Sequence, residues 1–403
     1  MKKKYFKKSV SVLLAFLMVM LAFLPVQLTV NAATDDSDSV GAISESENND
    51  DYASANSFSL NSTISGKMSS YDDADYYKIT PTKNGKVELT FNNTYTTSSV
   101  YWNIKMYCYQ GGSYTEFYNE TIYANSGETR ALPSIGASSG SIYYIAITTS
   151  SYYNSTGINY SIKNVFTATE YYEKEIDNSY SAATSMAFNQ TYGGVMNNYG
   201  DVDYYKFTPS QNGKIALTFN NTYKDASVYW NIKMYCYRDG SYTEFYSENI
   251  YANSGETRAL PSIGAVSGSV YYIVISTSSY YNSIGLDYSI KNVFTATEYY
   301  EKEIDNTYAT ATSMAFNQTY GGVMNNYGDV DYNKFTPSQN GKIALTFNNT
   351  FKDASVYWNI KMYCYQGGSY TEFYNETIYA NSGETRSLPS IGAVSGSVYY
   401  GNL

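Results

Sequence analysis

The stretch Val228-Tyr-Trp-Asn-Ile-Lys-Met-Tyr-Cys236 alternates apolar side chains with polar or tyrosine side chains. In a β-strand, successive side chains point to opposite faces of the sheet. One face of this stretch would carry Val228, Trp230, Ile232, Met234 and Cys236. The opposite face would carry Tyr229, Asn231, Lys233 and Tyr235. The pattern therefore predicts a strand with one buried side.

The same stretch occurs three times, at an interval of 128 residues. It is marked by a tryptophan and a cysteine in each copy: Trp102 and Cys108, Trp230 and Cys236, Trp358 and Cys364. Residues 173–272 and 301–400 differ at 10 of 100 positions, which indicates a recent duplication. An interval of this length suits a whole domain better than a solenoid repeat. We expect three domains, each with its own core.

Within a copy, short alternating segments are separated by turn residues. In the second copy we expect strands at 204–208, 214–219, 228–236, 242–251, 269–277 and 286–293. Asn-Gly at 212–213, Asp-Gly at 239–240 and Ser-Gly at 254–255 and 267–268 separate them. No long segment has a helical period. The pattern predicts an all-β protein of tandem antiparallel β-sandwich domains. Residues 180–188 are either a helical turn or an edge strand.

The composition restricts the chemistry. The chain has 403 residues, 26 Lys and Arg, 36 Asp and Glu, three cysteines and no histidine. Catalysis by Ser-His-Asp or Cys-His, and zinc or haem bound by histidine, are therefore excluded for this polypeptide alone. Paired carboxylates for glycoside hydrolysis remain, but the acids gather at one strand entry rather than across a cleft. We expect no enzyme, and the acidic balance argues against binding of nucleic acid.

The first 32 residues have the pattern of a signal peptide. Five lysines lie within residues 2–8, an apolar run covers 10–24, and Val30-Asn31-Ala32 offers small residues before a cut. A retained membrane anchor is the alternative. We expect cleavage, no stable membrane span afterwards, and a secreted or cell-surface protein. Residues 33–44 are predicted to be a disordered acidic spacer. With one buried cysteine per domain, no disulfide is expected.

Each copy opens with acidic and amide residues and has an Asp-x-Asp pair at the start of a later strand. In the first copy these are Glu45, Glu47, Asn49 and Asp50, followed by Asp73 and Asp75. The second copy has Glu173, Glu175, Asp177 and Asn178, followed by Asp201 and Asp203. The third has Glu301, Glu303 and Asp305, followed by Asp329 and Asp331. The predicted domains are 45–168, 169–296 and 297–403.

These spacings, with the later strands Gly140–Ile145 and Tyr160–Ile162, resemble the bacterial pre-peptidase C-terminal domain family. That family includes the collagen-binding domains of clostridial collagenases. The resemblance covers two complete copies and most of a third. It implies jelly-roll-like β-sandwiches that bind or target without doing chemistry. It also implies that the opening acids and the Asp-x-Asp pair hold calcium.

The chemistry of the residues agrees with calcium. Calcium prefers six to eight hard oxygen ligands, and carboxylates gathered by folding repel one another unless a cation neutralises them. All seventeen residues named above for the three copies are therefore candidate calcium ligands. In the second and third copies the Asn-Asp order becomes Asp177-Asn178 and Asp305-Asn306, which still supplies oxygens. The alternative is a solvated acidic linker beside a turn.

Fifty tyrosines offer a second candidate site. An exposed row of tyrosines on a flat sheet would suit a protein surface or a sugar ring. The candidates for ligand binding are Tyr101, Tyr107, Tyr109, Tyr229, Tyr235 and Tyr237. The alternative is that tyrosine only stabilises cross-strand pairs, without any ligand.

The third copy ends before its last two strands would be complete, and Asn333 replaces the tyrosine found at Tyr77 and Tyr205. We expect this copy to be unstable alone. Whether a catalytic or anchoring region lies downstream of Leu403 is left open by the sequence. The leading hypothesis is a non-catalytic binding or adhesion protein for an extracellular matrix or surface protein, or a polysaccharide. The alternatives are a structural surface spacer and the accessory part of a secreted peptidase. No oligomer is implied.

Overall fold

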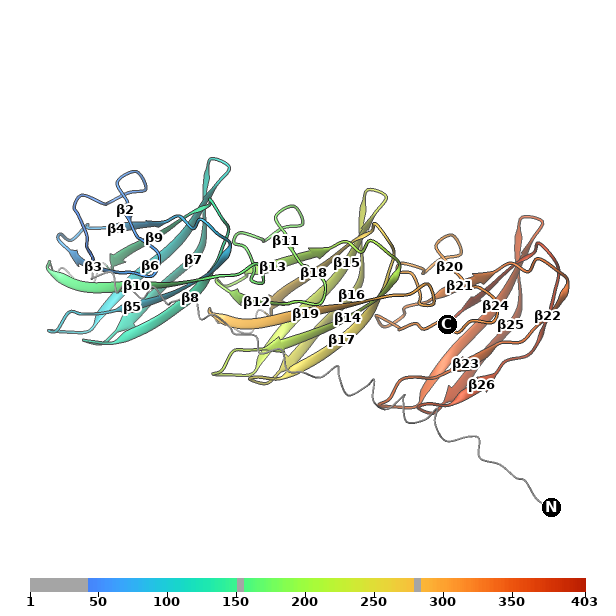
Figure 1. Cartoon of the computed structure of the whole chain (residues 1–403). Coiled ribbons are helices and arrows are strands. Elements are labelled where there is room, and N and C mark those ends of the chain that lie inside the picture. The colour runs from blue at the N-terminus through green and yellow to red at the C-terminus, as the bar shows by residue number, and fades with distance from the viewer. Residues whose placement is uncertain (1–42, 151–155, 279–283) are drawn as a thin grey trace, which may run out of the picture. The chain divides into compact units, whose positions relative to one another are not determined.

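A computed structural model describes residues 43–150, 156–278 and 284–403 (Figure 1). Every regular element in these ranges is a β-strand, which confirms the all-β prediction. None of these residues belongs to a helix of the length and apolarity that crossing a membrane requires. The expected signal peptide and residues 33–42 of the expected spacer lie outside the described residues. The last two spacer residues form the short strand β1 (Ile43–Ser44).

The first copy is a sandwich of two five-stranded sheets, ordered β1-β3-β10-β5-β8 and β2-β4-β9-β6-β7. Only the two-residue strands β1 and β2 pair in parallel with their neighbours, and the other pairs are antiparallel. The remaining strands are β2 (Asn56–Ser57), β3 (Thr63–Met68), β4 (Asp75–Ile79), β5 (Gly85–Asn92), β6 (Val100–Gln110), β7 (Ser113–Ala124), β8 (Thr129–Ala137), β9 (Ile142–Thr149) and β10 (Ile158–Ala168).

The second copy repeats this arrangement, with sheets ordered β11-β13-β18-β15-β16 and β12-β19-β14-β17. Its strands are β11 (Thr184–Ser185), β12 (Thr191–Met196), β13 (Val202–Phe207), β14 (Gly213–Asn221), β15 (Val228–Arg238), β16 (Ser241–Ala252), β17 (Thr257–Ala265), β18 (Val270–Thr277) and β19 (Leu286–Ala296). All six predicted strands are present, and the open segment 180–188 contains the edge strand β11. The sequence patterns gave no indication of β12 and β17.

The two sheets of a copy share one core. In β15 the five residues predicted to face inward are buried, and the four tyrosine and polar positions between them are not. The Trp230 ring is fully buried, with its centroid 5.1 Å from Phe219 of β14 and 5.4 Å from Tyr288 of β19. Since β15 belongs to one sheet and β14 and β19 to the other, the tryptophan packs between the layers. Cys108 and Cys236 are buried and free, and burial raises the pKa of the Cys108 thiol to about 11.

The third copy has one complete sheet, ordered β20-β21-β28-β24-β25, facing two separate strand pairs, β22-β27 and β23-β26. Its strands are β20 (Thr312–Ser313), β21 (Tyr332–Phe335), β22 (Gly341–Ile343), β23 (Thr346–Asn348), β24 (Val356–Gln366), β25 (Ser369–Ala380), β26 (Thr385–Ser387), β27 (Ile391–Ala393) and β28 (Val398–Asn402). Within residues 284–403, no strand of this copy takes the place that β19 has in the second. Trp358 is accordingly only half-buried.

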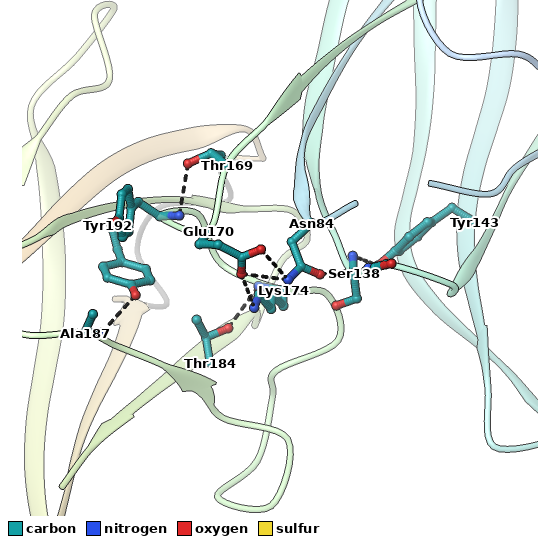
Figure 2. Close-up of polar contacts among 11 residues, drawn as sticks. Asn84, Ser138, Tyr143, Thr169, Glu170, Lys174, Thr184, Ala187 and Tyr192 are labelled. Carbon is teal, nitrogen blue, oxygen red and sulfur yellow. Dashed lines mark hydrogen bonds and ion pairs between the residues drawn. The ribbon is translucent and has the colours of Figure 1, made fainter. Parts of the chain in front are cut away.

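The start of the second copy packs directly on the first (Figure 2). The Asn84 amide donates to both oxygens of Glu170, at 2.9 and 2.7 Å, and Lys174 forms an ion pair with the same carboxylate. The Tyr143 hydroxyl donates to the carbonyl of Glu175 at 3.0 Å. The Glu175 backbone N–H donates to the Gly136 carbonyl at 2.8 Å. The opening acidic segment of the second copy is thus held on the first copy by several hydrogen bonds.

We predict that β24 loses its hydrogen bonds before β15 does. The two strands differ only at their last residue, Gln366 against Arg238. Any difference in protection therefore reflects their surroundings, because β28 pairs with β24 only from Lys361 to Tyr365 and no described strand takes the place of β19. Native-state hydrogen exchange in increasing urea should show β24 amides opening at the lower urea concentration. Equal protection of the two strands would contradict this account of the third copy.

Candidate metal centre

The opening acidic segment of the second copy spans the edge of the sandwich from one sheet to the other. The Glu173 N–H donates to the Gly193 carbonyl in β12, at 3.0 Å. The Asp177 carbonyl accepts a hydrogen bond from the Tyr204 N–H in β13, at 3.2 Å. Asp203 lies on β13 beside this second contact. Backbone pairing with both layers therefore brings the opening acids and the Asp-x-Asp pair together, as the sequence predicted.

All five acids of this cluster are buried: Glu173, Glu175, Asp177, Asp201 and Asp203. Burial is the first cause that raises the pKa of each carboxyl, and neighbouring carboxylates are a second cause for all except Asp201. Asp203 raises the pKa of Glu173, and Glu175 raises the pKa of Asp177. The groups are thus close enough to repel one another when ionised, and water does not screen them.

In four of these acids, one carboxylate oxygen is held by a protein donor. Glu173 Oε1 accepts from the Val195 N–H at 2.9 Å, and Asp177 Oδ2 accepts from the Thr184 hydroxyl at 2.9 Å. Glu175 Oε1 accepts from the Asn197 amide, and Asp203 Oδ2 accepts from the Tyr288 hydroxyl. These bonds fix the orientation of each carboxylate.

The other oxygen of each of these carboxylates is buried and accepts no hydrogen bond from a donor group, although Glu173 and Asp203 are close enough to hydrogen-bond to each other when one of them is protonated. The amide oxygen of Asn197 is likewise buried and accepts no hydrogen bond. The five atoms are Glu173 Oε2, Glu175 Oε2, Asp177 Oδ1, Asp203 Oδ1 and Asn197 Oδ1. Buried polar atoms are nearly always satisfied, and an unpaired buried charge is costly. Carboxylate and amide oxygens are the donor types that calcium prefers. Among the described acids, however, only those of the first copy include three whose oxygens lie within 4.8 Å of one another.

Asp201 and Asn178 have other positions. Both oxygens of Asp201 accept backbone hydrogen bonds, from Asn197 at 2.7 Å and from Val202 at 3.0 Å. Asp201 therefore closes the turn between β12 and β13, and burial raises its pKa to about 6. The Asn178 residue is exposed, and its side chain hydrogen-bonds to Asp201. These two residues support the turn rather than add an unpaired oxygen.

The first copy has the same cluster in a more open form. Two groups of three acids each have carboxylate oxygens that lie within 4.8 Å of one another. One group is Glu45, Glu47 and Asp75, and the other is Glu47, Asp50 and Asp73. Glu47 and Asp50 are exposed, whereas Asp75 is fully buried and burial raises its pKa to about 9. The buried Asn49 amide faces Glu47 Oε2 at 3.0 Å and Asp75 Oδ1 at 3.3 Å. With its nitrogen turned toward these oxygens, the amide donates a hydrogen bond to each of them. With its oxygen turned toward them, the amide would offer a further ligand to a cation.

The third copy keeps four buried acids, Glu301, Glu303, Asp305 and Asp331, and Asn333 stands at the position that Tyr205 has in the second copy. Asp305 Oδ2 accepts from the Thr312 hydroxyl at 2.7 Å, and the Asn325 amide donates to Glu303. Four oxygens are buried without a partner: Glu303 Oε2, Asp305 Oδ1, Asn325 Oδ1 and Asp331 Oδ1. Both Glu301 oxygens accept from the Val323 N–H, at 3.0 and 2.9 Å. Asp329 accepts from the Asn325 N–H at 2.7 Å, as Asp201 does from Asn197.

The predicted ligand set omitted several contributors to the cluster. Asn197 and Asn325 each add an unpaired oxygen, and Ser69 occupies the equivalent position in the first copy. A polar residue four positions before the first acid of each Asp-x-Asp pair was the signal that could have identified them. The hydroxyls of Tyr205 and Tyr288, 2.8 Å apart beneath the acids, carried no comparable signal.

The tyrosine candidates fall into two groups. Tyr107 and Tyr109 belong to a packed cluster around Tyr52, whose ring stacks on Tyr114 at 3.9 Å. Tyr235 and Tyr237 belong to the equivalent cluster around Tyr180, which stacks on Tyr242 at 4.0 Å. Tyr52 and Tyr180 directly follow the acidic segments. Each cluster therefore attaches its acidic segment to the outer face of a sheet.

Tyr101 and Tyr229 are instead exposed on the outer face, where each packs against a tyrosine of the next strand. The Tyr101 ring lies 4.7 Å from Tyr123, and the Tyr229 ring lies 4.7 Å from Tyr251. These four rings are 41–42% exposed. Tyr357 and Tyr379 form the same pair in the third copy, at 4.8 Å. We refer to these as the exposed tyrosine pairs.

Comparisons with known proteins identify no family for the chain. No family model matches it, and no curated protein matches it. Among solved structures, the tandem CBM22 domains of Xyn10C from Paenibacillus barcinonensis align over 55% of this chain and 82% of that one, with 14% identity and a TM-score of 0.20. The CUB1-EGF-CUB2 domains of human MASP-1/3 align over 57% and 98%, with 11% identity and a TM-score of 0.16.

Tripeptidyl peptidase 2 aligns over 60% of this chain but only 24% of its own length, with 11% identity and a TM-score of 0.23. At these values no function is transferred to this chain from any of the three structures. The resemblance to the pre-peptidase C-terminal family stays a prediction.

The acidic clusters predict an inverted pH dependence for the metal-free protein. The pKa values of Asp201, Asp331 and Asp75 are raised to about 6, 8 and 9, against about 4 in an unfolded chain. The folded state then binds more protons than the unfolded state between about pH 4 and pH 9. Stability should fall as pH rises through that window. Urea unfolding at pH 5, 7 and 9 in calcium-free buffer measures this, and constant or rising stability would contradict it.

Proposed function

We propose that the chain is a secreted, non-catalytic binding protein whose modules are stabilised by calcium. In this proposal each acidic cluster binds one ion, and the exposed tyrosine pairs contact an extracellular protein or a polysaccharide. The calcium part rests on the buried, unpaired oxygens of the second and third copies. The binding part rests on one observation, namely that all three copies present the same exposed pair on the same strands.

Calcium would complete the cluster of the second copy in a way that protein groups do not. Glu173, Glu175, Asp177 and Asp203 each carry a protein-held oxygen and an unpaired oxygen. A divalent ion would neutralise the mutual repulsion of the carboxylates and accept the unpaired oxygens as ligands. Since the acidic segment pairs with both sheets, an ion held there would join the two layers.

The exposed tyrosine pairs suit contact with another molecule. A tyrosine ring offers a rigid apolar surface and a polar tip with little loss of side-chain entropy. Copies joined in one chain would raise the apparent affinity for an extended ligand, provided that several pairs engage it together. A structural spacer is the second candidate, favoured by the direct hydrogen bonds that fix the second copy on the first.

Calcium should raise the thermal stability of the chain, and Asp203→Asn should reduce that response. Ligand binding to the folded state stabilises by about 2.7 kcal/mol at 100 times the dissociation constant, which corresponds to roughly 10 °C for a domain of this size. Without calcium, Asp203→Asn should melt higher than the unmodified chain, because the amide replaces a buried acid that must otherwise either bind a proton or carry a charge beside its neighbours. Calorimetry of both proteins, with and without millimolar calcium, measures these shifts.

The matched control is Asp225→Asn, which changes an exposed acid of the same copy. It should keep the full calcium response. A melting temperature of the unmodified chain that does not move with calcium would remove the ion from the proposal. An unaltered calcium response in Asp203→Asn would place the ion elsewhere.

Ligand binding is tested by co-sedimentation with fibrillar collagen, mucin and insoluble cellulose. Replacing the exposed pairs of the first two copies, Tyr101 with Tyr123 and Tyr229 with Tyr251, by serine should weaken retention at least tenfold on whichever material binds. Tyr199→Ser is the control, because Tyr199 is 57% exposed but lies outside the sheets. Retention lost equally in the control, or on none of the three materials, would favour the spacer.

A further inference from the structure

The third copy carries a groove of about 400 Å³ between β25 and the segment that leads into β27. Cys364, Phe373, Gly392 and Tyr399 are among the residues that line it. Phe373 is 43% exposed there, whereas its equivalents Phe117 and Phe245 are each 4% exposed. The groove is therefore open in the third copy and filled in the first two.

In the first copy, the acidic segment of the second copy fills the equivalent place. The residues equivalent to Cys364, Gly392 and Tyr399 are Cys108, Gly136 and Tyr143. The Glu175 carbonyl accepts from the Tyr143 hydroxyl at 3.0 Å and lies 3.9 Å from the Cys108 sulfur. The Glu175 N–H donates to the Gly136 carbonyl at 2.8 Å.

The same contacts recur between the second and third copies. The Tyr271 hydroxyl donates to the Glu303 carbonyl at 3.2 Å, and the Glu303 N–H donates to the Gly264 carbonyl at 2.8 Å. Ile176 packs against the core of the first copy, and Ile304 packs against the core of the second. One docking geometry thus joins both pairs of copies.

The glycines show that the groove is shaped for this segment. A Cβ atom at Gly136 would lie 2.3 Å from the Glu173 carbonyl oxygen, and one at Gly264 would lie 2.2 Å from that of Glu301. At Gly392 a Cβ atom would meet no described atom within 4 Å, apart from its chain neighbours. The space beside Gly392 is therefore free for a docked segment, and no contact within the third copy requires a glycine at this position.

The opening segments of the second and third copies, which dock on a preceding copy, differ in sequence from the opening segment of the first. The second and third copies place a tyrosine and an isoleucine beside the preceding copy: Tyr172 and Ile176, Tyr300 and Ile304. In the first copy the equivalent positions are Ser44 and Asn48. The Tyr172 ring also lies under the Lys86 ammonium at 5.5 Å, and Tyr300 lies under Lys214 at 5.1 Å. Lys342 is the equivalent lysine of the third copy.

We propose that the groove of the third copy is a docking site for an extended segment of the type Tyr-Glu-Lys-Glu-Ile, presented by a further repeat of this kind. The Gly392 carbonyl would accept from the N–H of the second glutamate of the segment. The Tyr399 hydroxyl would donate to the carbonyl of the same glutamate. Lys342 would lie over the tyrosine ring. This docking does not depend on the bound ion or on the exposed tyrosine pairs.

The test uses the purified protein and a synthetic peptide with the sequence of residues 170–178. Cys364 lines the groove, whereas Cys108 and Cys236 are fully buried, so iodoacetamide should modify Cys364 first in the native protein. Saturating peptide should slow the alkylation of Cys364 at least fivefold, as followed by mass spectrometry. A peptide with Tyr172→Ser and Ile176→Asn, which copies the first opening segment, should give no protection.

Two protein variants complete the test. Gly392→Val fills the docking space where no neighbouring atom is close, so its melting temperature should be unchanged while the peptide no longer slows alkylation. Phe373→Ser, at an exposed position, should weaken protection by the peptide. Equal protection by both peptides, protection that survives Gly392→Val, or none in the unmodified protein would overturn the proposal. If the chain self-associates and the peptide does not inhibit that association, the groove does not bind a Tyr-Glu-Lys-Glu-Ile segment, and the proposed occupant is wrong.

Discussion

The structure depends on how it accommodates several carboxylates that the fold removes from water. Each buried copy of the cluster brings four or five acids between the edges of two sheets, where burial and mutual repulsion both favour the protonated forms. Hydrophobic packing around Trp102 and Trp230 can stabilise the sheets themselves, but it does not offset charges at their edge. A neutralising group is required there, either protons or a cation.

The acidic segment also connects three parts of the architecture. Its backbone pairs with both sheets of its own copy, its following tyrosine anchors it to an outer face, and its isoleucine packs on the preceding copy. The side chains of Glu173 and Glu175 therefore lie in the acidic cluster of the second copy, whereas their backbone lies against the first copy at Gly136. This double use explains why Glu175 is buried, whereas the equivalent Glu47 of the first copy, which contacts no other described copy through this segment, is exposed.

Much of this could be predicted from the sequence, because the information lay in local periodicity and in repetition. The alternation in Val228–Cys236 identified the buried face of β15, and the acids of each copy were correctly expected to come together. Short strands such as β12, with glycines in place of alternating apolar residues, were missed. Tyr107 and Tyr109 could not be recognised as packed residues, because Tyr52, which packs on Tyr107 and on the Tyr114 ring beside Tyr109, comes from a distant segment. The role of Gly136 likewise depends on a contact with the next copy.

The most direct measurement is a crystal structure of the protein grown with calcium, using anomalous scattering to locate the ion. The account predicts a calcium peak within the acidic clusters, at about 2.3–2.6 Å from carboxylate oxygens. In the first copy these oxygens come from Glu45, Glu47 and Asp75, which lie within 4.8 Å of one another. Carboxyls that instead hydrogen-bond to one another as protonated acids, with no ion among them at millimolar calcium, would contradict it.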